Sequence, residues 1–198
     1  AVRIATWNVN SIRQRLDSLV SFLEQAIPDV LCLQEIKCLD DAFPRAEIEA
    51  LGYQVETLGQ KTFNGVAILS KYTLEDIRRG LPGDTSDEQA RYLEAVVPLP
   101  TGAVRVVCLY LPNGNPVDTE KYPYKIKWMH RLIAHTRELL AFEEPLVLAG
   151  DYNVIPEPRD CHDPAVWATD ALFLPQTRNT YRQLLALGLT DAVRATND

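Results

Sequence analysis

The sequence has 198 residues, enough for one substantial hydrophobic core, and its 46% hydrophobic and 24% charged residues are ordinary for a globular protein. No apolar run approaches the roughly 20 residues that a membrane-spanning helix needs, and the chain enters a strand-like pattern at once. We therefore expect a cytoplasmic protein without a membrane partner. The net charge of −7 argues against a protein that attracts polyanions by its overall charge alone.

Strand-like and helix-like patterns alternate along the chain. Apolar residues recur at helical spacing from Ile12 to Ala26 behind a cap candidate at Asn10 or Ser11, whereas residues 30–33 form the unbroken apolar run of a buried strand. The predicted order is strand 2–7, helix 12–26, strand 30–33, helix 44–51, strands 53–58, 65–70, 92–97 and 104–111, helix 123–141, strand 146–149 and helix 177–187. Consecutive central strands and the lack of a flexible linker predict a single α/β domain, residues 1–198, with a mixed sheet.

The charge of the chain is unevenly distributed. Five basic residues and no acidic residue lie between Lys121 and Arg137. Such a strip can bind phosphate groups, or it can form the solvated face of a helix. Charge alone leaves both interpretations open.

Polar residues stand at the ends of four predicted strands. Asn8 follows the first strand and Glu35 the second, Tyr110 lies near the end of the 104–111 strand, and Asp151 and Asn153 follow the 146–149 strand. Each has an ordinary explanation as a turn or helix-flanking residue. Ligands of α/β proteins gather at strand ends, so the four ends together favour a functional site.

These residue types suit a hard divalent cation and a phosphate group. Mg²⁺ binds oxygen ligands, with one or two carboxylates and substrate phosphate in a typical site, and Glu35 and Asp151 could supply the carboxylates. A tyrosine hydroxyl and asparagine amides could stabilise the charge of a phosphoryl transition state. The four cysteines form no Cys-x-x-Cys pair, and Cys32 and Cys108 lie in apolar runs, so we predict reduced, structural thiols and no thiol zinc site.

The ordered motifs resemble those of the exonuclease III family, which belongs to the endonuclease/exonuclease/phosphatase superfamily. The resemblance covers residues 2 to about 194 and rests on segments 6–13, 33–37, 59–61, 65–71, 78–84, 109–114 and 150–154. Any one of these motifs is short and weak evidence, but the complete set in this order is specific. The implied fold is a mixed-sheet α/β sandwich of the endonuclease/exonuclease/phosphatase type, incomplete at the C-terminus.

The resemblance implies a role for each matching residue at the strand ends. Glu35 is the expected principal metal ligand, with Asn8 in the metal and hydrogen-bond network. Asp151 is expected to orient or deprotonate the attacking water. Asn153 and Tyr110 are expected to contact the scissile phosphate.

The resemblance also implies DNA contacts further from the metal. Arg91, Asn113 and Lys121 match positions where the family places DNA-facing polar residues. Trp167 and Phe173 lie in a loop that relatives press against the DNA groove, although burial of these two aromatic rings under the loop is an equal alternative.

The implied activity is Mg²⁺-dependent DNA repair, with Mn²⁺ able to substitute. The family hydrolyses DNA 5′ to abasic sites and has 3′–5′ exonuclease and 3′-phosphatase activities, so the expected partner is duplex DNA with abasic sites or 3′ ends. We expect a monomer without an obligate protein partner. Relatives continue beyond this chain with further strands and an Asp-His pair that contacts the phosphate, so we expect a truncated chain of weak or no activity.

Three alternative functions remain open from the sequence. A superfamily phosphatase could act on another phosphoester, such as an inositol phosphate or a phospholipid headgroup. A protein that kept the scaffold could bind DNA without cutting it. A glycosidase-like pair of Glu35 and Asp151 is the most distant alternative, because the accompanying asparagine and tyrosine residues suit phosphate better.

Overall fold

The computed structural model describes residues 2–192, and the chain divides into two compact units. The sheet unit consists of Ala1–Tyr110 and Glu143–Tyr152, and the helical unit consists of Leu111–Phe142 and Asn153–Asp198. Residue 1 and residues 193–198, where the family resemblance ends, lie outside the described residues. The single domain expected from the sequence stays a prediction.

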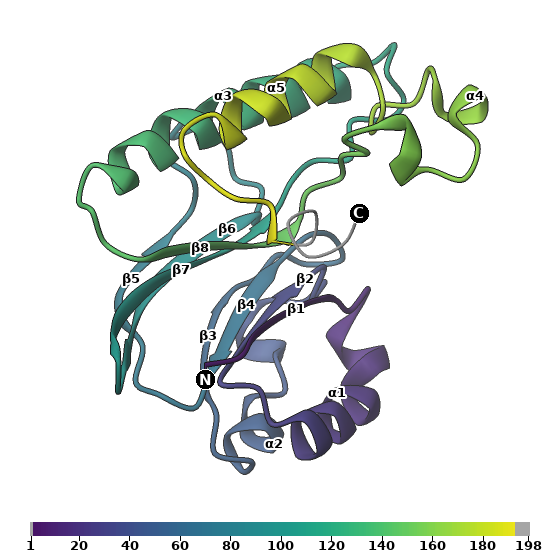
Figure 1. Ribbon diagram of the computed structural model, residues 1–198. Helices are drawn as coiled ribbons and strands as arrows, with labels where there is room; N and C mark the ends of the chain where they lie inside the picture. Colours follow the sequence, from purple (N-terminus) through teal and green to yellow (C-terminus); the bar gives the residue numbers. More distant parts are fainter. Residues whose placement is uncertain (1, 193–198) are drawn as a thin grey trace. The chain divides into compact units, whose positions relative to one another are not determined.

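The sheet unit contains two four-stranded mixed sheets (Figure 1). The first has the order β1 (Ile4–Asn8), β2 (Val30–Gln34), β4 (Val66–Ser70), β3 (Gln54–Leu58), and the second has the order β5 (Glu75–Arg79), β6 (Tyr92–Leu99), β7 (Gly102–Tyr110), β8 (Leu146–Asp151). The pairs β1–β2 and β7–β8 are parallel, and the other pairs are antiparallel. The predicted mixed-sheet α/β architecture is therefore confirmed.

Apolar side chains fill both faces of the first sheet. Cys32 and Ile68 on one face pack with Val106 and Cys108 of the second sheet. Leu31 and Leu33 on the other face join a core that includes residues of α1 (Ile12–Ala26) and α2 (Arg45–Glu49). Burial on both faces explains why β2 is an unbroken apolar run.

Helix α1 begins and ends where the sequence predicts. The Ser11 hydroxyl caps it by accepting a hydrogen bond from the Gln14 amide at 3.4 Å. Ile12, Leu19 and Leu23 are buried at helical spacing, so the apolar periodicity that predicted the helix is also what attaches it to the sheet.

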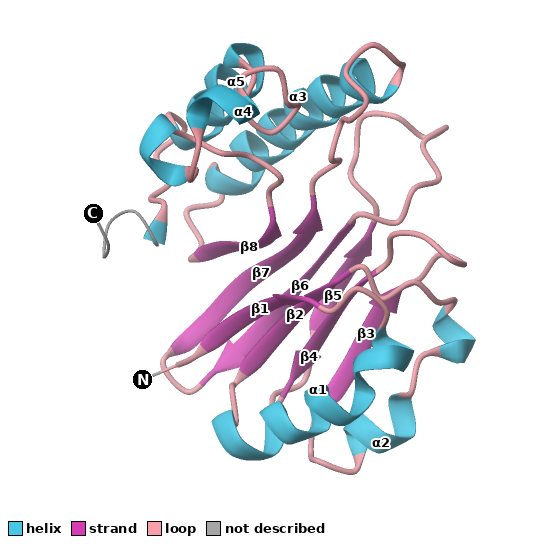
Figure 2. Cartoon of the chain, turned by 90° about the vertical axis from the view of Figure 1, so that its right-hand side faces the viewer, coloured by secondary structure: helices cyan, strands magenta, loops and turns pink. Residues whose placement is uncertain are grey.

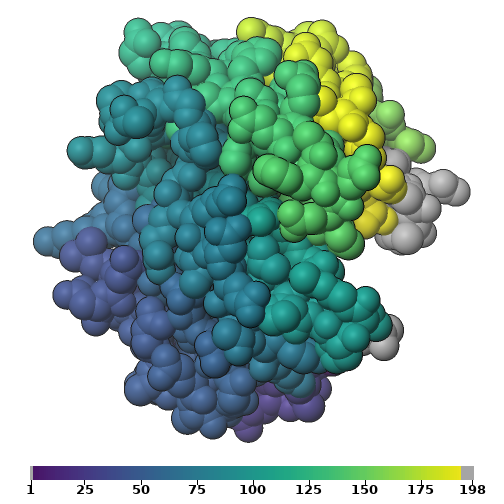
Figure 3. Space-filling view, turned by 90° about the vertical axis from the view of Figure 1, so that its left-hand side faces the viewer, coloured from purple at the N-terminus to yellow at the C-terminus, as the bar shows by residue number. Residues whose placement is uncertain are grey.

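The helical unit is built around two packed helices. It contains α3 (Lys121–Leu140), η2 (Pro158–Asp160), α4 (Pro164–Trp167) and α5 (Pro175–Leu185). Helices α3 and α5 lie side by side in Figures 1 and 2, and Figure 3 shows the yellow surface of α5 next to that of α3. The hydroxyl groups of Tyr122 and Thr177 share a buried hydrogen bond of 2.8 Å between these two helices.

Most predicted elements are present, with ends that differ by a few residues. The sequence did not predict β5, α4 or the short helices η1 (Asp40–Ala42) and η2. Among the described residues 2–192, strand β5 pairs only with β6, and the pairing contains a register shift between Glu75 and Arg78. Ile77 is the one residue of β5 that is not exposed. An edge strand of this kind lacks the apolar alternation on which strand prediction depends.

The predicted free thiols at the buried positions 32 and 108 are confirmed. All four cysteines are free, with Cys32 and Cys108 fully buried in the core between the sheets. Within residues 2–192, no helix is long and apolar enough to cross a membrane.

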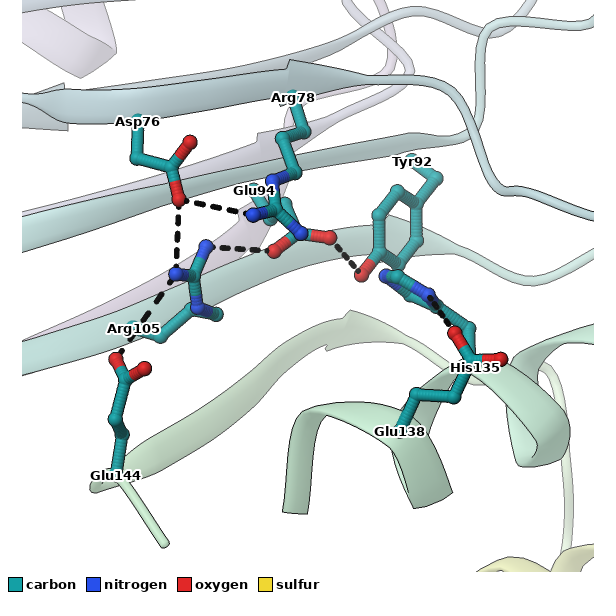
Figure 4. A network of polar contacts seen from close by, with 8 residues as sticks. All are labelled: Asp76, Arg78, Tyr92, Glu94, Arg105, His135, Glu138 and Glu144. Carbon is teal, nitrogen blue, oxygen red and sulfur yellow. Dashed lines mark hydrogen bonds and ion pairs between the residues drawn. The ribbon is translucent and has the colours of Figure 1, made fainter. Parts of the chain in front are cut away.

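A buried polar network crosses the second sheet (Figure 4). The Glu94 carboxylate is fully buried, and it accepts hydrogen bonds of 2.9 Å from the Tyr92 hydroxyl and from Arg105 Nη1. Arg105 Nη2 donates to the more exposed carboxylate of Asp76, also at 2.9 Å. The guanidinium group therefore neutralises a charge that water cannot reach.

Replacing Arg105 with methionine is expected to lower the free energy of unfolding by about 3–5 kcal/mol, because the Glu94 charge would stay buried without its partner. The matched control is Arg78→Met, which removes an exposed ion pair with Asp76 and should cost less than about 1 kcal/mol. Urea denaturation monitored by circular dichroism measures both. Equal losses in the two variants would contradict this assignment.

Candidate active site

The predicted polar residues lie at neighbouring strand ends in the sheet unit. Asn8 is the last residue of β1, and Glu35 directly follows β2, which is parallel to it. Tyr110 and Asp151 are the last residues of β7 and β8 and are direct partners in that parallel pair. Parallel neighbours end at the same edge of a sheet. Asn8 and Glu35 therefore lie together at the end of β1 and β2, and Tyr110 and Asp151 lie together at the end of β7 and β8.

Two side-chain hydrogen bonds connect the first sheet to the second at this edge. Asn8 Nδ2 donates to Asp151 Oδ2 at 2.9 Å, and the Tyr110 hydroxyl donates to Glu35 Oε1. Each bond joins residues far apart in the chain. The structure thus brings together Asn8, Glu35, Tyr110 and Asp151, a set that sequence spacing alone could not place.

The carboxylates of Glu35 and Asp151 both raise the pKa of Tyr110. Burial raises the pKa of Tyr110, and its hydrogen bond to Glu35 and the negative charges of Glu35 and Asp151 raise it further, while Arg91 opposes the change. Both carboxyl groups therefore lie within electrostatic range of one phenol rather than on opposite faces of the unit. The phenol stays protonated at neutral pH and can act as a hydrogen-bond donor.

The loops that carry these side chains adopt a left-handed backbone. Asn10, Ser11, Glu35 and Lys37 have φ values of 43°, 86°, 53° and 55°. Ser11 donates its amide to the Glu35 carbonyl at 2.8 Å, and the Lys37 amide donates to the Asn64 carbonyl at 2.9 Å. Residues other than glycine keep such conformations only when surrounding contacts fix them, and functional sites commonly contain them.

Arg91 is fixed to Tyr110 in three ways. Its guanidinium carbon lies 4.9 Å from the centroid of the Tyr110 ring, and its Nη1 donates to the Tyr110 carbonyl at 3.2 Å. The Tyr110 amide donates in return to the Arg91 carbonyl at 2.8 Å. Arg91 is thus a neighbour of the candidate active site, and its predicted DNA contact stays a prediction.

Three other predicted site residues belong to the helical unit. Asn113 and Lys121 are exposed, with Lys121 at the start of α3. Asn153 has a left-handed backbone, with φ of 45°, and its Nδ2 donates to the Leu111 carbonyl at 2.7 Å. Asn153 follows Asp151 by two residues in the chain, but the two belong to different units.

The aromatic residues of the 161–174 segment differ in exposure. Phe173 is buried, and the guanidinium group of Arg178 lies over its ring at 4.4 Å, so the burial alternative holds for this residue. Trp167, the last residue of α4, is half-buried.

One residue of the predicted basic strip does not face solvent. Lys125 is fully buried on α3, whereas Lys121, Lys127 and Arg137 are exposed. The charge pattern alone does not distinguish Lys125 from the surface residues of the strip. The helical spacing was the missed signal, because Lys125 falls in the apolar stripe of Tyr122, Ile126 and Met129.

The donor atoms at the strand ends suit Mg²⁺ or Mn²⁺. Glu35 and Asp151 offer carboxylate oxygens, and Asn8 offers an amide oxygen that also accepts a bond from the Asn10 amide at 3.1 Å. Among residues 2–192 there is no group of three or more histidine, cysteine, aspartate or glutamate side chains that could hold a metal. Carboxylate and amide oxygens are donors that hard divalent cations take in proteins.

The comparisons with known proteins agree on one family. The model of the endonuclease/exonuclease/phosphatase family matches residues 5–188. Exodeoxyribonuclease III of Haemophilus influenzae is 34% identical over 99% of this chain and 76% of its own length. Similar solved structures include an AP endonuclease from Archaeoglobus fulgidus, with 38% identity and a TM-score of 0.92 over 100% of this chain and 76% of that one. They also include a 3′-5′ exonuclease from Neisseria meningitidis, with 39% identity and a TM-score of 0.93 over 98% of this chain and 74% of that one.

The chain therefore belongs to the endonuclease/exonuclease/phosphatase family. Within it, the chain is an exodeoxyribonuclease III-like DNA-repair nuclease, which confirms the predicted family and hydrolase class. The family generally depends on a divalent metal. The chain spans about three quarters of the length of these relatives.

Proposed function

We propose that the protein hydrolyses duplex DNA on the 5′ side of abasic sites in the presence of Mg²⁺, with additional 3′–5′ exonuclease and 3′-phosphatase activities. The observation that carries this proposal is the set of two hydrogen-bonded pairs at the strand ends, Asn8 with Asp151 and Tyr110 with Glu35. The names of the relatives, an exodeoxyribonuclease III, an AP endonuclease and a 3′-5′ exonuclease, support the choice of substrate.

Each side chain of the two pairs has a distinct role in the proposed reaction. Asp151 accepts a proton from the attacking water, and the bond from Asn8 Nδ2 fixes one of its oxygens so that the other can face the water. The single Tyr110 O–H, which donates to Glu35 in this structure, donates instead to a phosphate oxygen as negative charge develops there. Glu35, with Asn8, would hold the cation. Bound Mg²⁺ supplies positive charge that neutralises the phosphoryl group.

The remaining predicted residues are proposed to bind DNA. Asn153 contacts the scissile phosphate, and Arg91, Asn113 and Lys121 contact the DNA. The exposure of Asn113 and Lys121 is compatible with this role. We propose that the protein acts as a monomer in the cytoplasm.

Tyr110→Phe is expected to lower kcat for abasic-site cleavage by about 10²–10³-fold, the loss typical of a single donor to a developing oxyanion. The Tyr110 pKa is raised above its ordinary value of about 10, so the phenol keeps its proton up to about pH 10. The variant should therefore lower the rate by a similar factor from about pH 7 to 9. A rate loss confined to the alkaline end would mean that the phenol titrates in this range and is not the donor assumed here.

The proposed substrate is tested by a competition assay. A duplex oligonucleotide with one abasic-site analogue is incubated with the protein and Mg²⁺, with or without excess inositol phosphates. We expect incision on the 5′ side of the analogue and no measurable release of phosphate from inositol phosphates. Release of inorganic phosphate from the inositol phosphates without incision would support a phosphatase instead, and DNA binding in EDTA without incision after Mg²⁺ addition would indicate a binding protein.

A further inference from the structure

Lys125 presents a positive charge to the backbone inside the helical unit. The side chain is fully buried on α3, and its Nζ donates to the carbonyl oxygens of Asn113 at 3.1 Å, Asn153 at 2.5 Å and Ala171 at 3.3 Å. An ammonium group has three N–H donors, the same number as these carbonyl acceptors. Burying a lysine is costly unless such hydrogen bonds replace its water.

The neighbouring residues are shaped to admit this side chain. A Cβ atom on Gly114, whose φ is +85°, would lie 2.7 Å from Lys125 Cδ and 3.1 Å from Ala171 Cβ. The glycine therefore leaves the space through which the lysine reaches the three carbonyls. The Asn115 side chain braces the same place, since its Oδ1 accepts from the Ala171 amide at 3.0 Å.

The three carbonyls belong to three segments that are distant in sequence. One follows β7, one follows β8, and one precedes α5. Two of them carry Asn113 and Asn153, which the proposed function assigns to DNA and to the scissile phosphate. The left-handed backbone at Asn153 is a conformation that needs external contacts to hold it, and its carbonyl receives the shortest of the three lysine bonds.

We propose that Lys125 is a positioning residue of the nuclease site. Its buried ammonium group holds the main chain at Asn153 in place. The main chain in turn sets the direction from which the Asn153 side-chain amide contacts the phosphate. The inference rests on the proposed function, because it assumes that Asn153 contacts the scissile phosphate. Lys125 itself does not touch DNA, in contrast to the exposed Lys121 four residues earlier.

A double-mutant cycle tests this role. The variants are Lys125→Met, Asn153→Ala and the two combined, and kcat and KM are measured on the abasic-site duplex with Mg²⁺. A misplaced catalytic contact costs up to ~10²-fold, so we expect Lys125→Met to lower kcat by about 10–100-fold and to change KM by less than about threefold. In the Asn153→Ala background the same substitution should lower kcat by less than about threefold, because the contact it positions is already absent.

Two further variants distinguish the positioning role of Lys125 from a loss of folding and from a general effect of its charge. Lys71→Met removes one positive charge from an exposed position in the sheet unit, and it should leave kcat unchanged. Lys125→Arg keeps a charged donor, so it should recover part of the lost kcat. If circular dichroism shows that Lys125→Met is unfolded, the cycle is measured with Lys125→Arg. This substitution should then lower kcat in the wild-type background and have little effect on kcat in the Asn153→Ala background.

The outcomes distinguish the two hypotheses. A kcat loss of equal factor in both backgrounds, or no loss at all, would overturn the positioning role while leaving the proposed function intact. Wild-type kcat in Asn153→Ala would instead show that Asn153 is not the phosphate contact, so both the role of that residue in the proposed function and the inference built on it would fall.

Discussion

Asp151→Asn is expected to reduce kcat for incision of abasic-site DNA by about 10²–10⁴-fold, the range for removal of a general base. The substitution keeps the shape of the side chain and one carbonyl oxygen, which can still accept the hydrogen bond from Asn8 Nδ2. It removes the negative charge and the basic oxygen that would accept the proton of the attacking water. Single-turnover incision at saturating Mg²⁺ measures the change.

The control for Asp151→Asn makes the same chemical change at an exposed position. Asp17 lies on the solvent side of α1, so Asp17→Asn should keep wild-type kcat. DNA affinity, measured by fluorescence anisotropy with Ca²⁺ in place of Mg²⁺, should be similar in the wild type and Asp151→Asn. If Asp151→Asn incises at a near-normal rate, Asp151 is not the base and the reaction assigned to this site is wrong.

Glu35→Ala is expected to abolish incision at Mg²⁺ concentrations that saturate the wild type. Glu35 is the proposed principal ligand of the cation, and loss even of residues that only support a ligand costs ~10–100-fold in metal affinity. We therefore expect loss of the ligand itself to lower the affinity for the cation by more than about 100-fold. Titration of Mn²⁺ followed by its electron paramagnetic resonance signal measures the affinity without relying on activity.

A conservative variant and an exposed control isolate the charge of Glu35. Glu35→Gln can still accept the hydrogen bond from Tyr110, so its fold should be preserved while its affinity for Mn²⁺ falls. Glu24→Gln, an exposed substitution on α1, should leave affinity and activity unchanged. Tight binding of Mn²⁺ to Glu35→Ala would place the cation elsewhere.

The elements predicted well are those in which periodicity and burial agree. Helix α1 has the bounds that its apolar spacing and its serine cap indicate, and β2 is recognisable because it is buried on both faces. Strand β5 was missed because an edge strand with a register shift carries mostly charged residues. The local pattern cannot show that such a segment pairs with β6.

The candidate site was predictable as a set of residues but not as an arrangement. Polar side chains at strand ends identified Asn8, Glu35, Tyr110 and Asp151, whereas only the folded chain shows which pairs form hydrogen bonds. The same limit applied to Lys125, because the acceptors of its ammonium group come from segments far apart in sequence. A charge count cannot distinguish a lysine that binds backbone carbonyls from one that binds DNA.

The central claim is that carboxylate and amide oxygens at the strand ends of the sheet unit hold one divalent cation that serves phosphodiester hydrolysis. Crystals grown with Mn²⁺ and an abasic-site duplex, with diffraction data collected at the manganese absorption edge, test it most directly. We expect an anomalous peak in coordination contact with the Glu35 carboxylate and next to a DNA phosphate. A peak that contacts DNA but lies away from Glu35 and Asn8 would contradict the claim.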